Sequence, residues 1–384
     1  MLVYVFSTAL SVVFAVLFTR SVRWRWLFPL AAVPLILVSA ARWGVGTDFA
    51  FTYLPEYRAA QHMAGVGRPA SEVVEYRRFL ASRGGRYKFG KTPEAVERHF
   101  VRAIARSEPT HRLLLRAAVK SGLGLRLVTG VNAIIALTLV FFAIGRQSRW
   151  PGLAVLFFVL TGNFFLSLNV MRQFTAIAIG VVAVSFIANR QPVRFLTAVG
   201  VAMLFHYSAV VLLPAYALSC VVLTPRRGVV LIGAALCLGC LLSPLIRDSL
   251  LKFGLTHYSG YFRSKLAEDG FEWMLFAINA CFLLMGAWYW KSVCSGNRLF
   301  AIWYGLTVMG TISLALSGMV PLMKRINYYY AAPHFLMLPE MLLSEGDVRR
   351  RRILTVLVVL AFVAETVVAV CVYNKNGALP YRLH

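Results

Sequence analysis

A short stretch near the N-terminus combines a cation, a carboxylate and a tight backbone turn. Arg42 and Asp48 flank a Gly-x-Gly sequence, and Tyr53 follows shortly afterwards. The stretch begins where a long apolar run ends, which places both charges at a membrane surface. Asp48 could act as a general base that accepts a proton from a sugar hydroxyl. Arg42 could hold a leaving diphosphate, and an ion pair between Arg42 and Asp48 is the structural alternative.

A second polar segment opens an apolar run in the middle of the chain. Asn169 lies three and four residues before Arg172 and Gln173, which puts the three side chains on one side of a helix start. We expect Asn169 to cap this helix. The free N–H groups of a helix start and an arginine fork can together bind a diphosphate. The structural alternative is an ordinary cap beside an arginine whose stem lies along the membrane.

Further candidates stand at other ends of apolar runs. His206 could bind phosphate oxygens or transfer a proton, although a lone histidine is more often a structural hydrogen-bonding group. Arg325 could bind an anionic headgroup, and Tyr328 could contact a glycan or belong to an interfacial aromatic belt. Glu365 lies inside an apolar run, where a carboxylate is either a functional group or half of a buried ion pair.

The composition indicates a helical membrane protein. The 384 residues are 59% hydrophobic and 14% charged, whereas soluble domains are about 45–50% apolar and about 25% charged. The net charge of +25 sits largely in short loops, so it indicates topology and contact with the lipid bilayer, with no nucleic acid as partner. Clusters with metal-ligand spacing are missing from the sequence, and we predict no metal and no cofactor.

Apolar runs predict an all-α polytopic membrane protein that forms a single integral-membrane domain over residues 1–384. About twelve passes are expected, two of them short and hairpin-like: 2–19, 26–41, 125–144, 151–168, 172–188, 194–206, 208–223, 229–246, 273–291, 299–317, 328–343 and 353–372.

Basic residues in the short loops predict the orientation. Arginines between the first two spans place that turn in the cytoplasm. The later basic loops are also cytoplasmic only if residues 194–223 cross the membrane twice, with a turn near His206. Residues 42–124 then form one long, basic extracytoplasmic loop. Within this loop, 93–107 and 113–119 have the pattern of amphipathic helices, which we expect to lie on the outer membrane surface.

The candidate side chains all fall on the outer face in this topology, although the topology was assigned from other residues. One carboxylate, one imidazole and three guanidinium groups at one surface suit the displacement of an anionic leaving group by a hydroxyl. The residues concerned are Asp48, His206, Arg42, Arg172 and Arg325.

At these positions the chain resembles the EpsG family of Wzy-like polysaccharide polymerases. An Arg-x-x-x-Gly-x-Asp stretch, an Asn-x-x-Arg-Gln segment, a Phe-His-x-Ser segment before an apolar helix with proline, and a late arginine before a tyrosine-rich helix start occur in the family's order over roughly residues 1–340. The matching residues are Arg42, Gly46, Asp48 and Tyr53; Asn169, Arg172 and Gln173; Phe205, His206, Ser208 and Pro214; and Arg325 and Tyr328. The loop over 65–124 departs from the family by being longer and more basic.

The resemblance implies a metal-independent, GT-C-like glycosyltransferase in the bacterial cytoplasmic membrane. It would join oligosaccharide repeat units carried on undecaprenyl diphosphate at the outer face, next to a chain-length regulator and a flippase as possible partners. In this interpretation Arg172 and Arg325, with Arg42, bind the diphosphate, and Asp48 or His206 deprotonates the acceptor hydroxyl. The alternatives are a GT-C enzyme that uses a polyprenyl-phosphate sugar, a lipid-linked oligosaccharide flippase, and a membrane scaffold.

Overall fold

The computed structural model describes residues 1–20, 22–67, 93–219, 223–252, 272–317 and 323–383. These parts of the chain are helical, and within them the β pairing is limited to an isolated bridge between Arg42 and Leu383. The prediction of an all-α protein is therefore confirmed.

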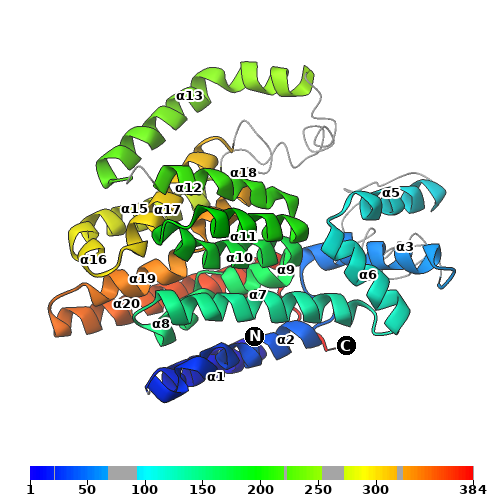
Figure 1. The fold of residues 1–384 in the computed structure, drawn as a ribbon, viewed down its shortest axis with the longest axis horizontal. Coiled ribbons are helices and arrows are strands. Elements are labelled where there is room, and N and C mark those ends of the chain that lie inside the picture. The colour runs from blue at the N-terminus through cyan, green and yellow to red at the C-terminus, as the bar shows by residue number, and fades with distance from the viewer. Residues whose placement is uncertain (21, 68–92, 220–222, 253–271, 318–322, 384) are drawn as a thin grey trace.

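The centre of the molecule is a bundle of helices (Figure 1). Aromatic side chains pack in its core. Phe157, Phe158, Phe164, Trp303 and Phe335 are almost fully buried there. The bundle comprises α7 (Leu125–Gln147), α8 (Pro151–Leu160), α9 (Asn163–Asn169), α10 (Met171–Ala188), α11 (Pro192–Phe205), α17 (Leu299–Ala315) and α19 (His334–Leu343).

Further helices surround this bundle (Figure 1). One side carries α1 (Leu2–Arg20), the 3-10 helix η1 (Val22–Ala32) and α2 (Val33–Ala41). The others include η4 (Tyr207–Leu212), α12 (Leu213–Ser219), α13 (Pro225–Lys252), α15 (Trp273–Trp288), α16 (Trp290–Gly296), and α20 (Val348–Val367) with its continuation η6 (Val368–Val372).

The helices support a polytopic membrane protein. Four are long and apolar enough to cross a bilayer: Leu2–Arg20, Leu125–Gln147, Met171–Ala188 and Val348–Val372. The number rises to six if each of two bent helix pairs is one span. Five further apolar helices in the described parts of the chain are only 10–17 residues long, and the number of about twelve passes stays a prediction.

Three predicted spans are broken rather than continuous. The run 151–168 bends by 53° between α8 and α9, and the run 273–291 bends by 76° between α15 and α16. The run 328–343 is interrupted between α18 (Met323–Ala331) and α19. Hydropathy does not reveal these breaks, because the residues on either side remain apolar. At the first break Gly162 has a φ of +78°, a conformation that glycine adopts at little cost.

The chain turns back at His206, as the basic loops required. α11 ends at Phe205, and His206 has an extended conformation before η4 and α12. The rings of Phe195 and Tyr216, at the far ends of the two arms, lie 5.4 Å apart between centroids. The two arms therefore lie side by side as a hairpin, and His206 is at its tip.

The loop over residues 42–124 contains a compact helical cap at one end of the bundle (Figure 1). It consists of the π-helix η2 (Phe49–Tyr53), α3 (Leu54–Met63), α5 (Pro93–Arg106) and α6 (Pro109–Ser121). Helices α5 and α6 cover the two segments predicted to be amphipathic helices. Their position on the outer membrane surface stays a prediction, and the structure shows a protein partner for one face of α6. Its apolar residues Leu115 and Ala118 are buried in a small core against α3 and α7. Amphipathic spacing alone does not distinguish a protein partner from a lipid one.

The turn between α2 and η2 fits closely against the end of α9. Gly46 has a φ of +98°, and a Cβ built there would lie 2.6 Å from the carbonyl oxygen of Leu168. Gly44 also has a positive φ, of +68°, but a Cβ there would meet no atom within 4 Å. The two glycines therefore share a left-handed backbone conformation but differ in the space available for a side chain.

This difference gives a matched pair of variants. We expect Gly44→Ala to cost about 1 kcal/mol, from the left-handed conformation alone. Gly46→Ala should lower the apparent melting temperature in detergent further, because the turn must also move away from α9. Equal melting temperatures for the two variants would contradict the close contact.

Candidate functional site

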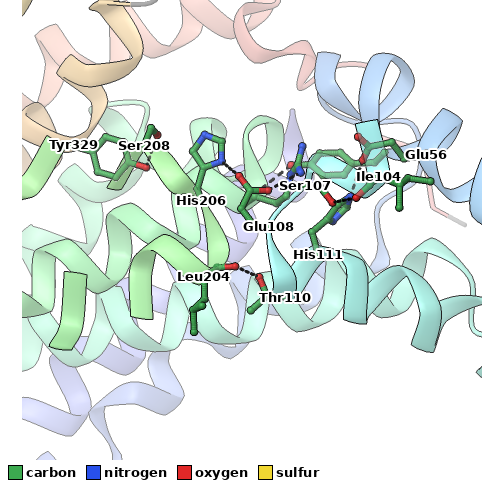
Figure 2. Close-up of polar contacts among 12 residues, drawn as sticks. Glu56, Ile104, Ser107, Glu108, Thr110, His111, Leu204, His206, Ser208 and Tyr329 are labelled. Atoms are coloured by element: carbon green, nitrogen blue, oxygen red, sulfur yellow. Dashed lines mark hydrogen bonds and ion pairs between the residues drawn. The ribbon is translucent and has the colours of Figure 1, made fainter. Parts of the chain in front are cut away.

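A carboxylate from the cap lies between two side chains of the bundle. Glu108 directly precedes α6, and its Oε2 accepts a hydrogen bond from Arg172 Nη1 at 2.9 Å. Its Oε1 lies 2.6 Å from His206 Nδ1. Figure 2 shows the Glu108 and His206 side chains pointing toward each other. Burial would raise the pKa of Glu108, but the hydrogen bond from His206 and the charge of Arg172 outweigh it and lower this pKa to about 2. Glu108 is therefore ionised near neutral pH, and His206 keeps Nε2 free of this contact.

A second pair lies behind Arg172. Glu56 on α3 contacts His111 Nε2 on α6 at 2.7 Å, and both side chains are almost fully buried. Burial opposes ionisation of Glu56, yet Arg172 and His111 hold the pKa of this carboxyl below its usual value. Burial and the charge of Arg172 also lower the pKa of His111. A neutral His111 therefore donates to an ionised Glu56.

Tyr53 joins the cap to the first turn of α10. Its hydroxyl accepts a hydrogen bond from the backbone N–H of Arg172 at 3.3 Å. The guanidinium of Arg172 also lies over the Tyr53 ring, 5.6 Å from its centroid, in a cation–π contact. Arg172 is thus held by a carboxylate, a ring and a backbone contact, and its side chain remains 17% exposed.

Asp48 faces this cluster without a direct partner. Among the described residues, none donates a hydrogen bond to its carboxylate. Burial raises the pKa of Asp48, and the charges of Arg325 and Arg172 act in the opposite direction. The carboxylate is thus held near cations while its oxygens remain available to another molecule.

The backbone of Asp48 is fixed by Asn169. The Asn169 Oδ1 atom accepts from the Asp48 N–H and from the Thr47 hydroxyl, each at 2.9 Å. Its Nδ2 donates to Asn376 Oδ1 at 3.3 Å. The prediction that Asn169 caps the next helix is wrong, because α10 begins after Val170 without a side-chain cap. The helix break after α9 turns Asn169 toward the Asp48 segment instead.

Arg325 enters the site from α18. Gln173 on α10 donates from Nε2 to the Arg325 carbonyl oxygen at 2.9 Å, which positions the start of α18. Within the described chain the Arg325 guanidinium has no hydrogen-bonding or ion-pair partner. Because Asp48 and Arg325 interact electrostatically without pairing directly, a ligand could contact both.

Arg42 is not part of this cluster. It is buried, and its guanidinium donates to the backbone carbonyls of Ser39 and Leu168. The ion pair with Asp48 that the sequence left open is not formed. Arg42 instead holds the end of α9 against α2, so the structure places it behind the Asp48 turn.

The comparison with protein families covers nearly the whole chain. The model of the EpsG family matches residues 25–383. The protein belongs to the EpsG family. EpsG is a Wzy-like polymerase family, which gives this chain a general role as a membrane-embedded polysaccharide polymerase of the glycosyltransferase type. No curated protein and no solved structure matched.

Most predicted site residues of this EpsG-family protein lie in one region. Arg172, His206, Arg325 and Asp48 interact electrostatically. Tyr328 on α18 also lies within reach of the charges of Arg325 and Asp48. The roles assigned to these residues stay predictions. In the described residues no group of three His, Cys, Asp or Glu side chains is placed to hold a metal ion.

The sequence interpretation missed Glu108, Glu56 and His111, which provide the carboxylates and the second imidazole. Glu108 has a local signal, because it directly precedes a proline that begins a helix. Glu56 and His111 lie on the buried faces of short helices, and nothing in their local sequence shows that the two helices meet.

The shared carboxylate predicts a pH-dependent stability. The pKa of Glu108 falls from 4.5 to about 2 on folding, so its charge stabilises the protein fully above pH 4.5 and loses its effect as the pH falls toward 2. We expect Glu108→Gln to cost about 3 kcal/mol at pH 7. This difference from the wild type should shrink below pH 4.5 in thermal unfolding in detergent.

A more exposed ion pair provides the control. Glu272 contacts Lys324 at 2.8 Å, with side chains 24% and 30% exposed. Glu272→Gln should therefore cost less than about 1 kcal/mol. A Glu108→Gln effect that is as small, or that does not change with pH, would contradict the role of Glu108.

Proposed function

We propose that the protein polymerises oligosaccharide repeat units carried on undecaprenyl diphosphate, at the outer face of the bacterial cytoplasmic membrane. The observation that carries the proposal is a pair of groups in an EpsG-family site to which no described residue is hydrogen-bonded or ion-paired: the Asp48 carboxylate and the Arg325 guanidinium. Arg172 adds a second, partly exposed cation. A general base beside two arginines suits the transfer of a glycan from a diphosphate to a hydroxyl.

The step proceeds by displacement at the anomeric carbon of the donor. Asp48 accepts the proton of the acceptor hydroxyl, and the hydroxyl oxygen forms a bond to that carbon. The bond from the carbon to the diphosphate oxygen breaks, and undecaprenyl diphosphate leaves with the electron pair. Arg325 and Arg172 stabilise the negative charge that develops on the leaving oxygen.

Asp48 is better suited than His206 to act as the general base. His206 already contacts the ionised Glu108 through Nδ1. Asp48 has a raised pKa and two carboxylate oxygens without a described donor. His206 then holds a phosphate oxygen or the acceptor through Nε2. We propose that this division of roles works without a metal, as in GT-C-like transferases, and that a chain-length regulator and a flippase act together with the enzyme.

The arginine assignment is tested with Arg325→Ala, Arg325→Lys and Arg194→Ala. Arg194 is exposed, and its guanidinium contacts Gln191 at the opposite end of α11 from His206. We expect Arg325→Ala to reduce polymer formation from purified lipid-linked repeat units by about 100-fold or more. The lysine variant should recover part of this loss, and Arg194→Ala should match the wild type.

Polymer length is read on a gel as a ladder. Normal ladders from Arg325→Ala would overturn the diphosphate assignment. Addition of a single sugar by the wild type would instead identify a GT-C enzyme that does not polymerise.

The base assignment is tested by the pH dependence of polymerisation. Below the pKa of Asp48 its carboxyl is protonated and does not accept a proton, so the wild-type rate should fall as the pH falls through that raised pKa. We expect Asp48→Asn to lower the rate by about 100-fold or more and to remove this acidic limb. Retention of the limb in Asp48→Asn would contradict the assignment.

A further inference from the structure

A groove next to the site takes no part in the proposed transfer step. It has a volume of about 490 Å³ and lies between α9, α15, α18, α19 and α20. It passes the break between α8 and α9, where Thr161 and Gly162 form part of its wall. The bend of 53° at this break moves α9 out of line with α8.

The mouth of the groove adjoins the candidate site. Tyr328 and Asn376 line it. Asn376 accepts a hydrogen bond from Asn169, which also holds the Asp48 backbone. Tyr328 follows Arg325 by one helical turn on α18. A molecule bound by its anionic group at Arg325 would therefore have its next atoms at this mouth.

Among the described lining residues, the two charged side chains lie near each other, and in the predicted topology they mark the outer mouth of the groove. Lys375 and Glu365 line the groove, and their charges interact. Glu365 lies seven residues before the end of η6, or about 10 Å along the helix. A polar mouth of this kind suits a ligand with a charged head and an apolar body.

Beyond this mouth the walls are mainly apolar. They include Phe165, Ile278, Phe282, Met285 and Phe362. Along α15 the lining extends from Met274 to Met285, which corresponds to about 17 Å of helix. This is roughly half the thickness of the hydrocarbon core of a bilayer. The groove is thus long enough for a chain that enters from the outer surface.

The groove is accessible from the side that the bilayer would cover. Met274 is 58% exposed, and the Cys281 thiol is also exposed. Both line the groove from α15. A lipid chain could therefore enter laterally, without passing through the protein core.

We infer that this groove binds the first isoprenoid units of the lipid carrier while the diphosphate lies at Arg325 and Arg172. The inference rests on the proposed function, because that function places the diphosphate beside the mouth. The occupant is an isoprenoid chain attached to a diphosphate rather than a membrane phospholipid, since Tyr328, one turn after Arg325, and Asn376, bonded to Asn169, place the groove wall next to the cationic site. The groove would orient the donor so that the anomeric carbon faces Asp48.

Thiol protection tests the occupant directly. A variant that keeps Cys281 as its only cysteine is treated with a maleimide in detergent, with and without undecaprenyl diphosphate. We expect the carrier to slow the alkylation of Cys281 by about tenfold. A second variant keeps only Cys237, an exposed thiol on α13 outside the groove, and its alkylation should not change.

Phosphatidylglycerol at the same concentration distinguishes the two lipid types. It should leave Cys281 unprotected. Equal protection by the phospholipid, or none by undecaprenyl diphosphate, would overturn the inference.

A bulky side chain placed in the groove tests whether the groove binds the donor during polymerisation. Ile278→Trp narrows the groove, whereas Leu284→Trp adds the same ring on α15 at a position that is 72% exposed and outside the lining. The wild type and Leu284→Trp should use repeat units on an undecaprenyl chain at least tenfold better than the same units on a short isoprenoid. Ile278→Trp should lose this preference and still polymerise the short-chain donor.

The two proposals fail in different ways. A wild type that uses long and short chains equally well would exclude the groove but leave the polymerase assignment intact. A wild type that polymerises neither donor would exclude the polymerase assignment. The thiol measurement does not depend on turnover, so it tests the groove even if Ile278→Trp does not fold.

Discussion

The site depends on the pairing of buried charge between the cap and the bundle. An isolated ion in a poorly hydrated interior costs several kcal/mol, so Arg172 at the start of α10 needs a counter-charge. Glu108 supplies it from the segment before α6 and contacts His206 with its other oxygen. One carboxylate therefore joins the cap, α10 and the tip of the α11 hairpin. Asp48 and Arg325, whose charged groups have no direct partner among the residues that the structure describes, lie next to this junction.

The C-terminal segment provides a second constraint. Tyr4 on α1 donates to the carbonyl of Ala378, and Tyr381 donates to the carbonyl of Val38 on α2. The N–H of Gly46 donates to the carbonyl of Gly377. The last residues of the chain therefore lie against the turn that presents Asp48. Residues from opposite ends of the sequence thus fix the backbone of the proposed base.

Broken helices connect the polar site with the apolar groove. A break leaves backbone groups without partners, which is tolerated where protein covers them or where they line a cavity. At the break between α8 and α9 the Thr161 hydroxyl bonds to the carbonyl of Phe157, and Gly162 turns the chain. At the break between α11 and η4 the backbone N–H of His206 donates to the carbonyl of Ala202. The first break forms part of the groove wall, and the second presents an imidazole to Glu108.

The sequence determined the class of the protein, the hairpin and much of the site. Apolar runs and basic loops are local patterns that reflect the cost of burying charge and leaving apolar surface in water. They were sufficient to place Asp48, Arg172, His206 and Arg325 at one face, and these residues lie together in the structure. The turn at His206 followed from the need to keep the later arginines inside.

The tertiary structure decided which of these charges are paired. Asn169 does not cap a helix but accepts a hydrogen bond from the backbone of Asp48. Arg42 is buried and donates to the backbone carbonyl of Leu168. Glu108 and Glu56 entered the site because the short cap helices fold back onto α10. Pairing depends on contacts between segments far apart in the chain, and a one-dimensional pattern records the chemistry of each segment but not which segments meet.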